Sequence, residues 1–287
     1  MERWTIPWRD IQPNRRWPLV WPREHGAWGI LFVSLFSGIA VGASSKVTLV
    51  REVWLLTAAA AVFCARTPIE NALFPDCPLH PRTVSELRWM AFFAAAFSVI
   101  VGVALAMLFA DPLPAGFFAV GVLAGVTLEL QSVLKMAGRQ LRVFAQLTGA
   151  LGLTATAAMA YSVAMARMDR VALALWATNG LFATNQILYV QLRIQQHRAA
   201  THKKALVYKR VFIGTEFLTA ACLTFWWRIS WIPAATLLAF VPALLRGAIW
   251  CILPSNRSLD IRRLGTEELA HGLVFAGLLS IGFRVSL

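Results

Sequence analysis

The chain has 287 residues, of which 58% are hydrophobic and only 14% are charged. An ordinary soluble domain has about 45–50% apolar and about 25% charged residues, so this composition excludes an ordinary soluble fold and indicates a polytopic membrane protein. The net charge of +13 lies mostly in short gaps between apolar segments. Membrane topology favours such a pattern. We therefore expect membrane lipids, and no nucleic acid, as partners.

Nine apolar segments are long enough to cross a hydrocarbon core of about 30 Å, which needs about 20 residues of helix. Helices are expected because a segment in lipid must satisfy its own backbone hydrogen bonds. The predicted spans are residues 26–43, 53–74, 89–110, 115–134, 143–166, 171–192, 211–227, 232–252 and 267–283. The sequence thus predicts an all-α bundle with about nine transmembrane helices, in which residues 1–25 precede a single transmembrane domain, residues 26–287.

The basic residues predict the orientation of this bundle. With the N-terminus inside, most of the 27 Lys and Arg residues fall on the cytoplasmic side, many of them in residues 193–210. Cytoplasmic loops carry this excess in membrane proteins. We therefore expect a multi-pass protein of the cell inner membrane with a cytoplasmic N-terminal segment. The four cysteines form no CxxC pair, so free thiols are expected.

The first cluster of site candidates lies at the entry of the first helix. Polar groups within lipid are costly, so each one is a functional candidate. Pro22 and Glu24 fit ordinary capping of a helix start. Capping does not account for His25 and Trp28, which lie three residues apart on one helix face. Glu24, His25 and Trp28 are therefore predicted to contribute to substrate binding.

The second cluster follows the second helix and contains Arg66, Glu70, Asn71 and Asp76. Two acids, an amide and a guanidinium near the cytoplasmic surface could bind a metal ion and an anion together. Glu70 and Asp76 are the candidate metal ligands. The alternative is a solvated loop with a surface ion pair.

The third cluster runs along the sixth helix from Asn179, Asn185 and Gln186 to Arg193 and His197. The two asparagines could bond across helices. The basic run after them fits either positive-inside topology or a contact with an anionic lipid headgroup, and a pyrophosphate or phospholipid site is the sharper hypothesis.

The remaining candidates lie in the fourth, seventh and ninth helices. Glu268 and His271, which follow Arg263, share a helix face, a spacing also found in di-metal helical bundles. Glu129 and Glu216 lie within helices four and seven. We expect both to face the bundle interior and to pair with Arg246, an amide or a proton.

The run Pro22-Arg-Glu-His-Gly-Ala-Trp28 resembles the opening signature of the YwiC-like membrane proteins. Arg263-x-Gly265-x-x-Glu268 and the stretch from Arg139 to Gly149 are similar to later parts of that family. The resemblance spans most of the chain, and it implies a family rather than a reaction.

Nine helices with the N-terminus inside also resemble the UbiA-type intramembrane prenyltransferases. In that family, aspartate-rich loops after helices two and six hold Mg²⁺ on a prenyl diphosphate. The resemblance implies Asp76, Asn71 and Glu70 as catalytic residues, with Mg²⁺ at Asp76 and Glu70. The second loop departs from the pattern, because Tyr189 and Arg193, rather than acids, follow Asn185.

The leading hypothesis is therefore a UbiA-like bundle that binds an isoprenoid or lipid phosphate at its cytoplasmic mouth, and in its enzymatic form transfers the prenyl or lipid group. The residues expected to contact this substrate are Arg66, Asn185, Arg193, His197, Glu24, His25, Trp28, Glu129, Arg263, Glu268 and His271. A transporter or permease is the alternative, with Glu129, Glu216, Arg246 and Asn179 along a central path. A non-catalytic membrane partner is the third class.

Overall fold

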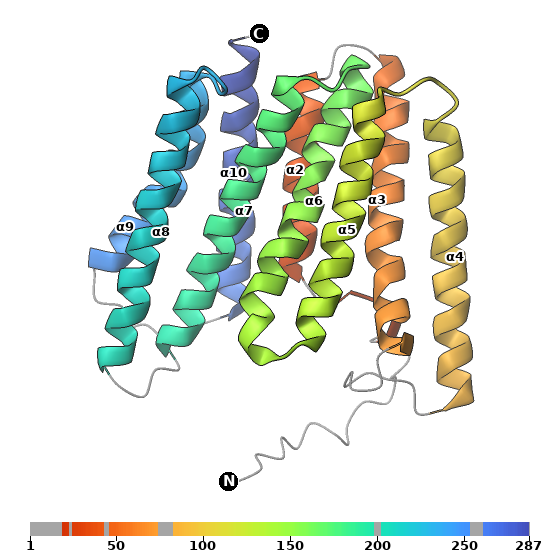
Figure 1. Ribbon diagram of the computed structural model, residues 1–287, viewed down its shortest axis with the longest axis horizontal. Coiled ribbons are helices and arrows are strands. Elements are labelled where there is room, and N and C mark those ends of the chain that lie inside the picture. Colours follow the sequence, from red (N-terminus) through yellow and green to blue (C-terminus); the bar gives the residue numbers. More distant parts are fainter. Residues whose placement is uncertain are drawn as a thin grey trace. The chain divides into compact units, whose positions relative to one another are not determined.

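The computed structural model describes residues 19–22, 25–42, 46–73, 83–197, 202–252 and 261–286. Within these residues the protein is all-helical, with nine α-helices (Figure 1). They are α2 (His25–Gly42), α3 (Lys46–Leu73), α4 (Val84–Leu108), α5 (Ala115–Met136), α6 (Arg142–Met165), α7 (Arg170–His197), α8 (His202–Arg228), α9 (Val241–Ile252) and α10 (Ile261–Arg284). Each of the nine apolar segments overlaps one of these helices, in order. The all-α prediction is therefore confirmed.

Four stretches of the described residues are long and apolar enough to cross a membrane. They are Val84–Leu108, Ala115–Met136, Arg142–Met165 and Ala234–Cys251. Helix α2 is apolar over Gly26–Gly42 but is shorter. These helices indicate a multi-pass membrane protein, whereas nine crossings and a cytoplasmic N-terminus stay predictions.

Local sequence signals account for the helix boundaries. Helix α4 begins after Thr83, whose hydroxyl accepts a hydrogen bond from the backbone N–H of Glu86 at 3.2 Å, as an N-cap does. Helix α7 follows Asp169, whose carboxylate accepts from the N–H groups of Val171 and Ala172. Helix α6 ends at Met165, and the following residue, Ala166, has a left-handed backbone conformation (φ 52°).

The chain divides into two compact units. The first comprises residues 1–24 and 54–110 and the second comprises residues 25–53 and 111–287. In the first unit, Leu19 and Val20 pack with Met90 of α4, and the Asn71 amide donates a hydrogen bond to the Leu19 carbonyl at 3.0 Å. Asn71 therefore links Leu19, which precedes α2 in the chain, to the end of α3. The single transmembrane domain expected over residues 26–287 stays a prediction.

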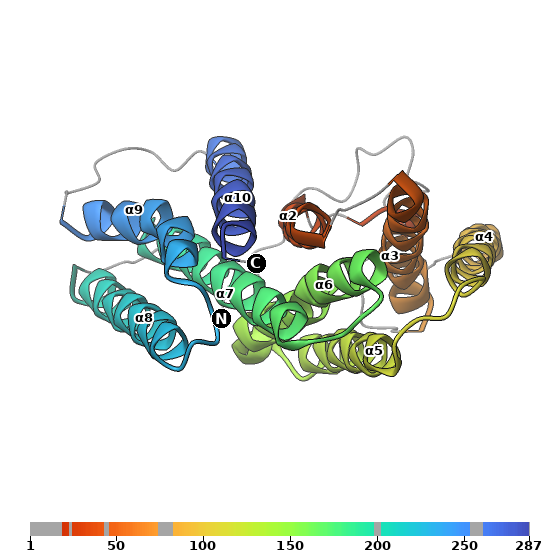
Figure 2. The same ribbon diagram turned by 90° about the horizontal axis from the view of Figure 1, so that it is seen from above.

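The second unit is a bundle in which α6 packs against α2, α5 and α7, while α10 packs against α2 (Figures 1 and 2). The side of α7 away from these helices carries α8, which contacts α9. Small residues make the close approaches possible. A Cβ atom on Gly38 of α2 would collide with the Ala157 carbonyl of α6, and one on Gly152 would lie 2.5 Å from the Thr127 hydroxyl of α5. Small residues of α2 and α6 thus let these helices pack closely against their neighbours.

Several helix bounds differ from the apolar windows. Helix α8 begins nine residues before the predicted span at position 211, and α3 begins seven residues before position 53. Both extensions contain several charged residues, which kept them out of the apolar windows although they are helical. The span predicted over residues 232–252 is divided into a 3₁₀ helix, η2 (Ala234–Phe240), and α9. Pro233 precedes η2 and cannot donate a backbone hydrogen bond.

Candidate functional site

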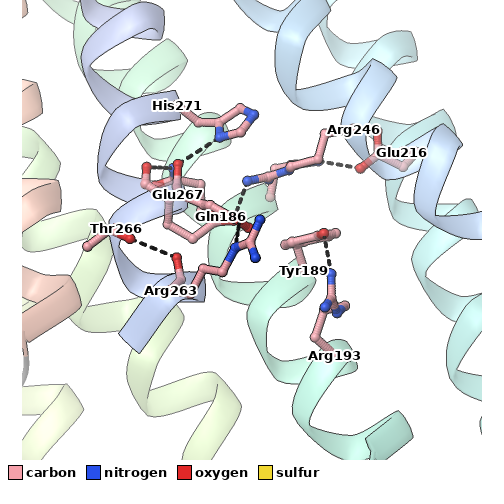
Figure 3. A network of polar contacts seen from close by, with 11 residues as sticks. Gln186, Tyr189, Arg193, Glu216, Arg246, Arg263, Thr266, Glu267 and His271 are labelled. Carbon is pink, nitrogen blue, oxygen red and sulfur yellow. Dashed lines mark hydrogen bonds and ion pairs between the residues drawn. The ribbon is translucent and has the colours of Figure 1, made fainter. Parts of the chain in front are cut away.

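A network of polar side chains lies among helices α7, α8, α9 and α10 of the second unit (Figure 3). Its centre is Arg246 of α9, which forms an ion pair with Glu268 of α10. The two side chains are only 13% and 12% exposed. The Arg246 guanidinium also lies over the ring of Tyr189 of α7, 4.0 Å from the ring centroid. A buried cation paired with a carboxylate and stacked on an aromatic face is held in one orientation.

The second carboxylate of the network is Glu216 of α8. Its Oε1 atom accepts a hydrogen bond of 2.8 Å from the Asn185 side-chain amide of α7. A Cβ atom on Gly247 of α9 would lie 2.8 Å from the same oxygen. The missing side chain at position 247 therefore lets the Glu216 carboxylate approach the α9 backbone beside Arg246, whose charge acts on it.

Two further cations surround Trp250 of α9. The Arg193 guanidinium of α7 lies 5.8 Å from the Trp250 ring centroid, and the Lys209 ammonium of α8 lies 5.7 Å from it. Arg193 donates to the Tyr189 hydroxyl at 2.9 Å, and Lys209 donates to the Cys251 carbonyl at 3.2 Å. These bonds position two half-buried positive groups around one indole ring, an arrangement that suits an anion.

Helix α10 joins the network through its first turns. The Gln186 amide of α7 donates to the Glu268 carbonyl at 2.9 Å. His271 contacts the Glu267 carbonyl through Nδ1 at 2.7 Å, one turn back on the helix. Arg263 pairs with Glu267 at 2.9 Å, but both side chains are largely exposed. Arg263 and Glu267 therefore border the network rather than form its buried part.

Several buried atoms of the network have no hydrogen-bonding partner among the described residues. Such atoms are found in Glu216 (Oε2), Glu268 (Oε2), Asn185 (Oδ1), Arg246 (Nε and Nη2) and Trp250 (Nε1). A buried polar group without a partner costs about 1–3 kcal/mol. Their concentration in one place leaves this network with unused hydrogen-bonding capacity.

Three sequence candidates lie together in the first unit at the end of α3. Arg66 and Glu70 form an ion pair of 2.6 Å one helical turn apart, and Asn71 binds the Leu19 carbonyl. The pair is partly buried, so it is more than a solvated surface contact. Asp76, the fourth member, lies outside the described residues.

The other candidates from the sequence either lie apart from the network or lie outside the residues that the structure describes. Trp28 stacks on Phe32 along α2, with ring centroids 5.7 Å apart. His197 is exposed at the C-terminal end of α7. Glu24 and the side chain of His25 lie outside the described residues.

Glu129 and Asn179 differ from the expected central path. Glu129 is exposed on α5, so the expectation that it faces the bundle interior is wrong. Its neighbours Val126, Leu130 and Val133 are exposed as well, which indicates an outward helix face. Asn179 is 2% exposed and donates to the Ser37 hydroxyl of α2 at 3.0 Å. This bond fits the interhelical role that was its alternative.

Sequence reasoning missed Lys209, Trp250, Gly247 and Glu52. Glu52 of α3 is 3% exposed, and neither carboxylate oxygen has a hydrogen-bonding partner among the described residues. In the sequence, Trp250 resembles any tryptophan at a membrane interface, and Lys209 resembles any basic residue of a cytoplasmic loop. The sequence signal that pointed to this part of the protein was the i, i+4 spacing of Asn185, Tyr189 and Arg193, because it places all three on one face of α7. It did not identify the residues of other helices that pack against that face.

A metal site is not evident where the structure describes the chain: no group of three or more His, Cys, Asp and Glu side chains could hold an ion there. The carboxylates of the network do not fit Mg²⁺, because Glu268 pairs with Arg246 and Glu216 binds the Asn185 amide. Cys64, Cys222 and Cys251 are free thiols, as predicted, whereas Cys77 lies outside the description.

A hollow of about 290 Å³ lies at the other end of the second unit from the network. Its lining includes Arg170 at the start of α7, Trp227 at the end of α8 and Ser286 after α10. None of its lining residues belongs to the network. The hollow and the network are therefore separate features.

Comparison with known proteins supports one of the resemblances. Residues 21–161 match the model of the YwiC-like protein family. This stretch contains the Pro22–Trp28 signature and the Arg139–Gly149 segment, but it ends before α7. No curated protein and no solved structure matches the chain. Residues 21–161 are thus similar to the YwiC-like family.

Proposed function

We propose that the whole chain is a YwiC-like integral protein of the inner membrane. We further propose that Arg193 of α7, Lys209 of α8 and Trp250 of α9 bind the anionic headgroup of a lipid-like or isoprenoid molecule at the cytoplasmic end of the bundle. The observation that carries this proposal is the convergence of Arg193 and Lys209 on Trp250. Arginine and lysine bind phosphate groups through charge-assisted hydrogen bonds. An indole ring between them supports the apolar part of such a ligand.

The contacts of Glu268 and Glu216 argue against a role for these carboxylates in a UbiA-like transfer reaction. Ionisation of a prenyl diphosphate in that family depends on Mg²⁺, and the buried carboxylates of the network are engaged by Arg246 and Asn185. We therefore propose that the headgroup binds through Arg193 and Lys209. Asp76 and Glu70 remain the proposed ligands if a transfer reaction exists.

Binding of farnesyl diphosphate and of inorganic pyrophosphate, measured by native mass spectrometry of the full chain in phosphatidylcholine nanodiscs, tests this proposal. Removing a charged hydrogen-bonding partner costs about 1.5–3 kcal/mol, so R193Q and K209Q should each weaken binding by roughly tenfold or more. R210Q is the matched control, because Arg210 neighbours Lys209 but is exposed. Equal binding by R193Q and R210Q would contradict the proposal.

A transporter is the second candidate, and the observation that favours it is the buried Glu216–Arg246–Glu268 group. Transport sites commonly use paired ionisable residues within a bundle. Glu129 and Asn179 do not contribute to this group, so the candidate path is narrower than the one expected from the sequence. Uptake of inorganic pyrophosphate into proteoliposomes tests this candidate. Uptake that ceases in R246Q, although R246Q still binds farnesyl diphosphate, would favour transport.

A further inference from the structure

The Glu216–Arg246–Glu268 group has an unequal number of charges. Two carboxylates share one guanidinium, and Arg246 pairs with Glu268 while Glu216 binds the Asn185 amide. If both carboxylates were ionised, the group would carry a net negative charge inside an apolar bundle. An uncompensated buried charge is strongly unfavourable. The group therefore needs one more positive charge.

Among the described residues of the surrounding helices, no further ion pair supplies this charge to the group. Arg193 and Lys209 hydrogen-bond to the Tyr189 hydroxyl and the Cys251 carbonyl. On α10, Glu267 pairs with Arg263, and His271 contacts a backbone carbonyl. A charge on His271 acts on Glu268, whereas the cation that acts on Glu216 is Arg246. The remaining titratable neighbours are Tyr189 and Cys251, which are acids rather than cations. Residues 26–42 of α2 include no titratable side chain.

We propose that Glu216, Arg246 and Glu268 form a proton-binding site that takes up one proton, carried on Oε2 of Glu216. Oε1 of Glu216 accepts the Asn185 amide, whereas Oε2 is buried and has no partner among the described residues. The Asn185 carbonyl oxygen beside it is likewise without a donor. Asn185 is 2% exposed. A proton on Oε2 turns one unsatisfied acceptor into a donor and removes the net charge.

The protonation state of Glu216 also determines which carboxylates interact with Arg246. When Glu216 is protonated, Arg246 forms an ion pair with Glu268 alone. When the proton leaves, two carboxylates compete for one guanidinium, and Gly247 allows Glu216 to approach it. Proton uptake is thus coupled to the position of Arg246. This inference is independent of headgroup binding, which rests on Arg193 and Lys209.

Labelling with N,N′-dicyclohexylcarbodiimide tests the proposal on the wild-type chain in phosphatidylcholine nanodiscs. The reagent reacts with a protonated carboxyl group: the proton passes to one carbodiimide nitrogen, the carboxylate oxygen bonds to the central carbon, and acyl migration to nitrogen gives a stable N-acylurea. Peptide mass spectrometry should find the adduct on Glu216, decreasing as the pH rises. Glu267 is the control, because it is exposed and paired with Arg263.

Infrared spectroscopy gives a second measurement. One carbonyl band of a protonated carboxyl group should disappear in E216Q and persist in E267Q, while any band from the buried Glu52 should be the same in both variants. An adduct on Glu216 that does not depend on pH, an adduct mainly on Glu268, or protection by sodium ions at constant pH would each overturn the proposal. If E216Q does not fold, the wild-type labelling decides alone. Labelling of Glu216 that persists in R193Q separates this site from headgroup binding.

Discussion

Arg246 makes two contacts that depend on the shape of its side chain. The guanidinium pairs with Glu268 and at the same time covers the Tyr189 ring at 4.0 Å. A lysine ammonium could form the ion pair but would not stack as a plane on the ring. The residue is therefore specified by geometry as well as by charge.

The Arg246–Glu268 pair should show strong coupling in a double-mutant cycle. Breaking a buried pair by removing one partner typically costs about 3–5 kcal/mol, because the other charge is left uncompensated. R246Q should destabilise the protein strongly, and the double variant R246Q/E268Q should lose much less than the sum of the single changes. Thermal unfolding in detergent measures this. Additive losses would show that the two residues do not interact.

Gly247 should be intolerant of a larger side chain for a local reason. A Cβ atom there would lie 2.8 Å from Glu216 Oε1 and 2.9 Å from a Phe212 ring carbon. We expect G247V to lower stability by about 1–3 kcal/mol, as overpacking does, and to displace Glu216. G214A on α8 is the control, because nothing lies within 4 Å of the added atom. Thermal melting of both variants distinguishes a packing effect from a general sensitivity of glycine.

The members of the network could be predicted from the sequence only where lipid makes their presence costly. Asn185, Glu216 and Arg246 interrupt apolar helices, so the cost of a polar group in lipid pointed to them before the structure. Lys209 and Trp250 lie toward helix ends, where basic and aromatic residues are ordinary. Their role depends on the approach of α8 and α9 to α7, which only tertiary packing reveals.

At the level of the helices, apolar windows predicted the number and order of elements but not their ends. A hydropathy window ends where charged residues begin, whereas the backbone hydrogen bonds of a helix continue through such residues. Helices α3 and α8 extend beyond their apolar windows in this way. The division of the eighth span at η2 follows from Pro233 and the 3₁₀ geometry after it, which a hydropathy average does not detect.

The contact between α2 and α6 should depend on Gly38. A Cβ atom at this position would collide with the Ala157 carbonyl, which is backbone and cannot move aside as a side chain does. We expect G38A to separate the two helices and to lower the thermal midpoint clearly. The matched change G102A in α4 meets nothing within 4 Å and should be neutral or slightly stabilising. Equal melting of the two variants would contradict this account of the interface.

In the molecule as a whole, the family match and the polar network occupy different parts of the chain. The YwiC-like match ends at residue 161 within α6, whereas every helix of the network begins after it. The small-residue interface between α2 and α6 lies within the matched part, so its packing belongs to the region shared with the family. The chemistry of the network therefore depends on residues that lie outside the matched part.

The orientation of the second unit can be tested at two positions at its opposite ends. Helix α6 begins at Arg142, and helix α8 ends at Arg228, at the other end of the bundle (Figure 1). Both side chains are exposed. Because basic residues gather on the cytoplasmic side, we expect R228C, but not R142C, to react with an impermeant maleimide in intact cells.

This measurement needs a background in which the four native cysteines are replaced, and permeabilised cells should label both positions. The reverse pattern would place the network, together with Arg193 and Lys209, at the outer end of the unit. A phosphate-bearing headgroup would then be recruited from the outer leaflet, and Glu216 would exchange its proton with the exterior. The same two cysteines therefore determine from which side both proposed ligands arrive.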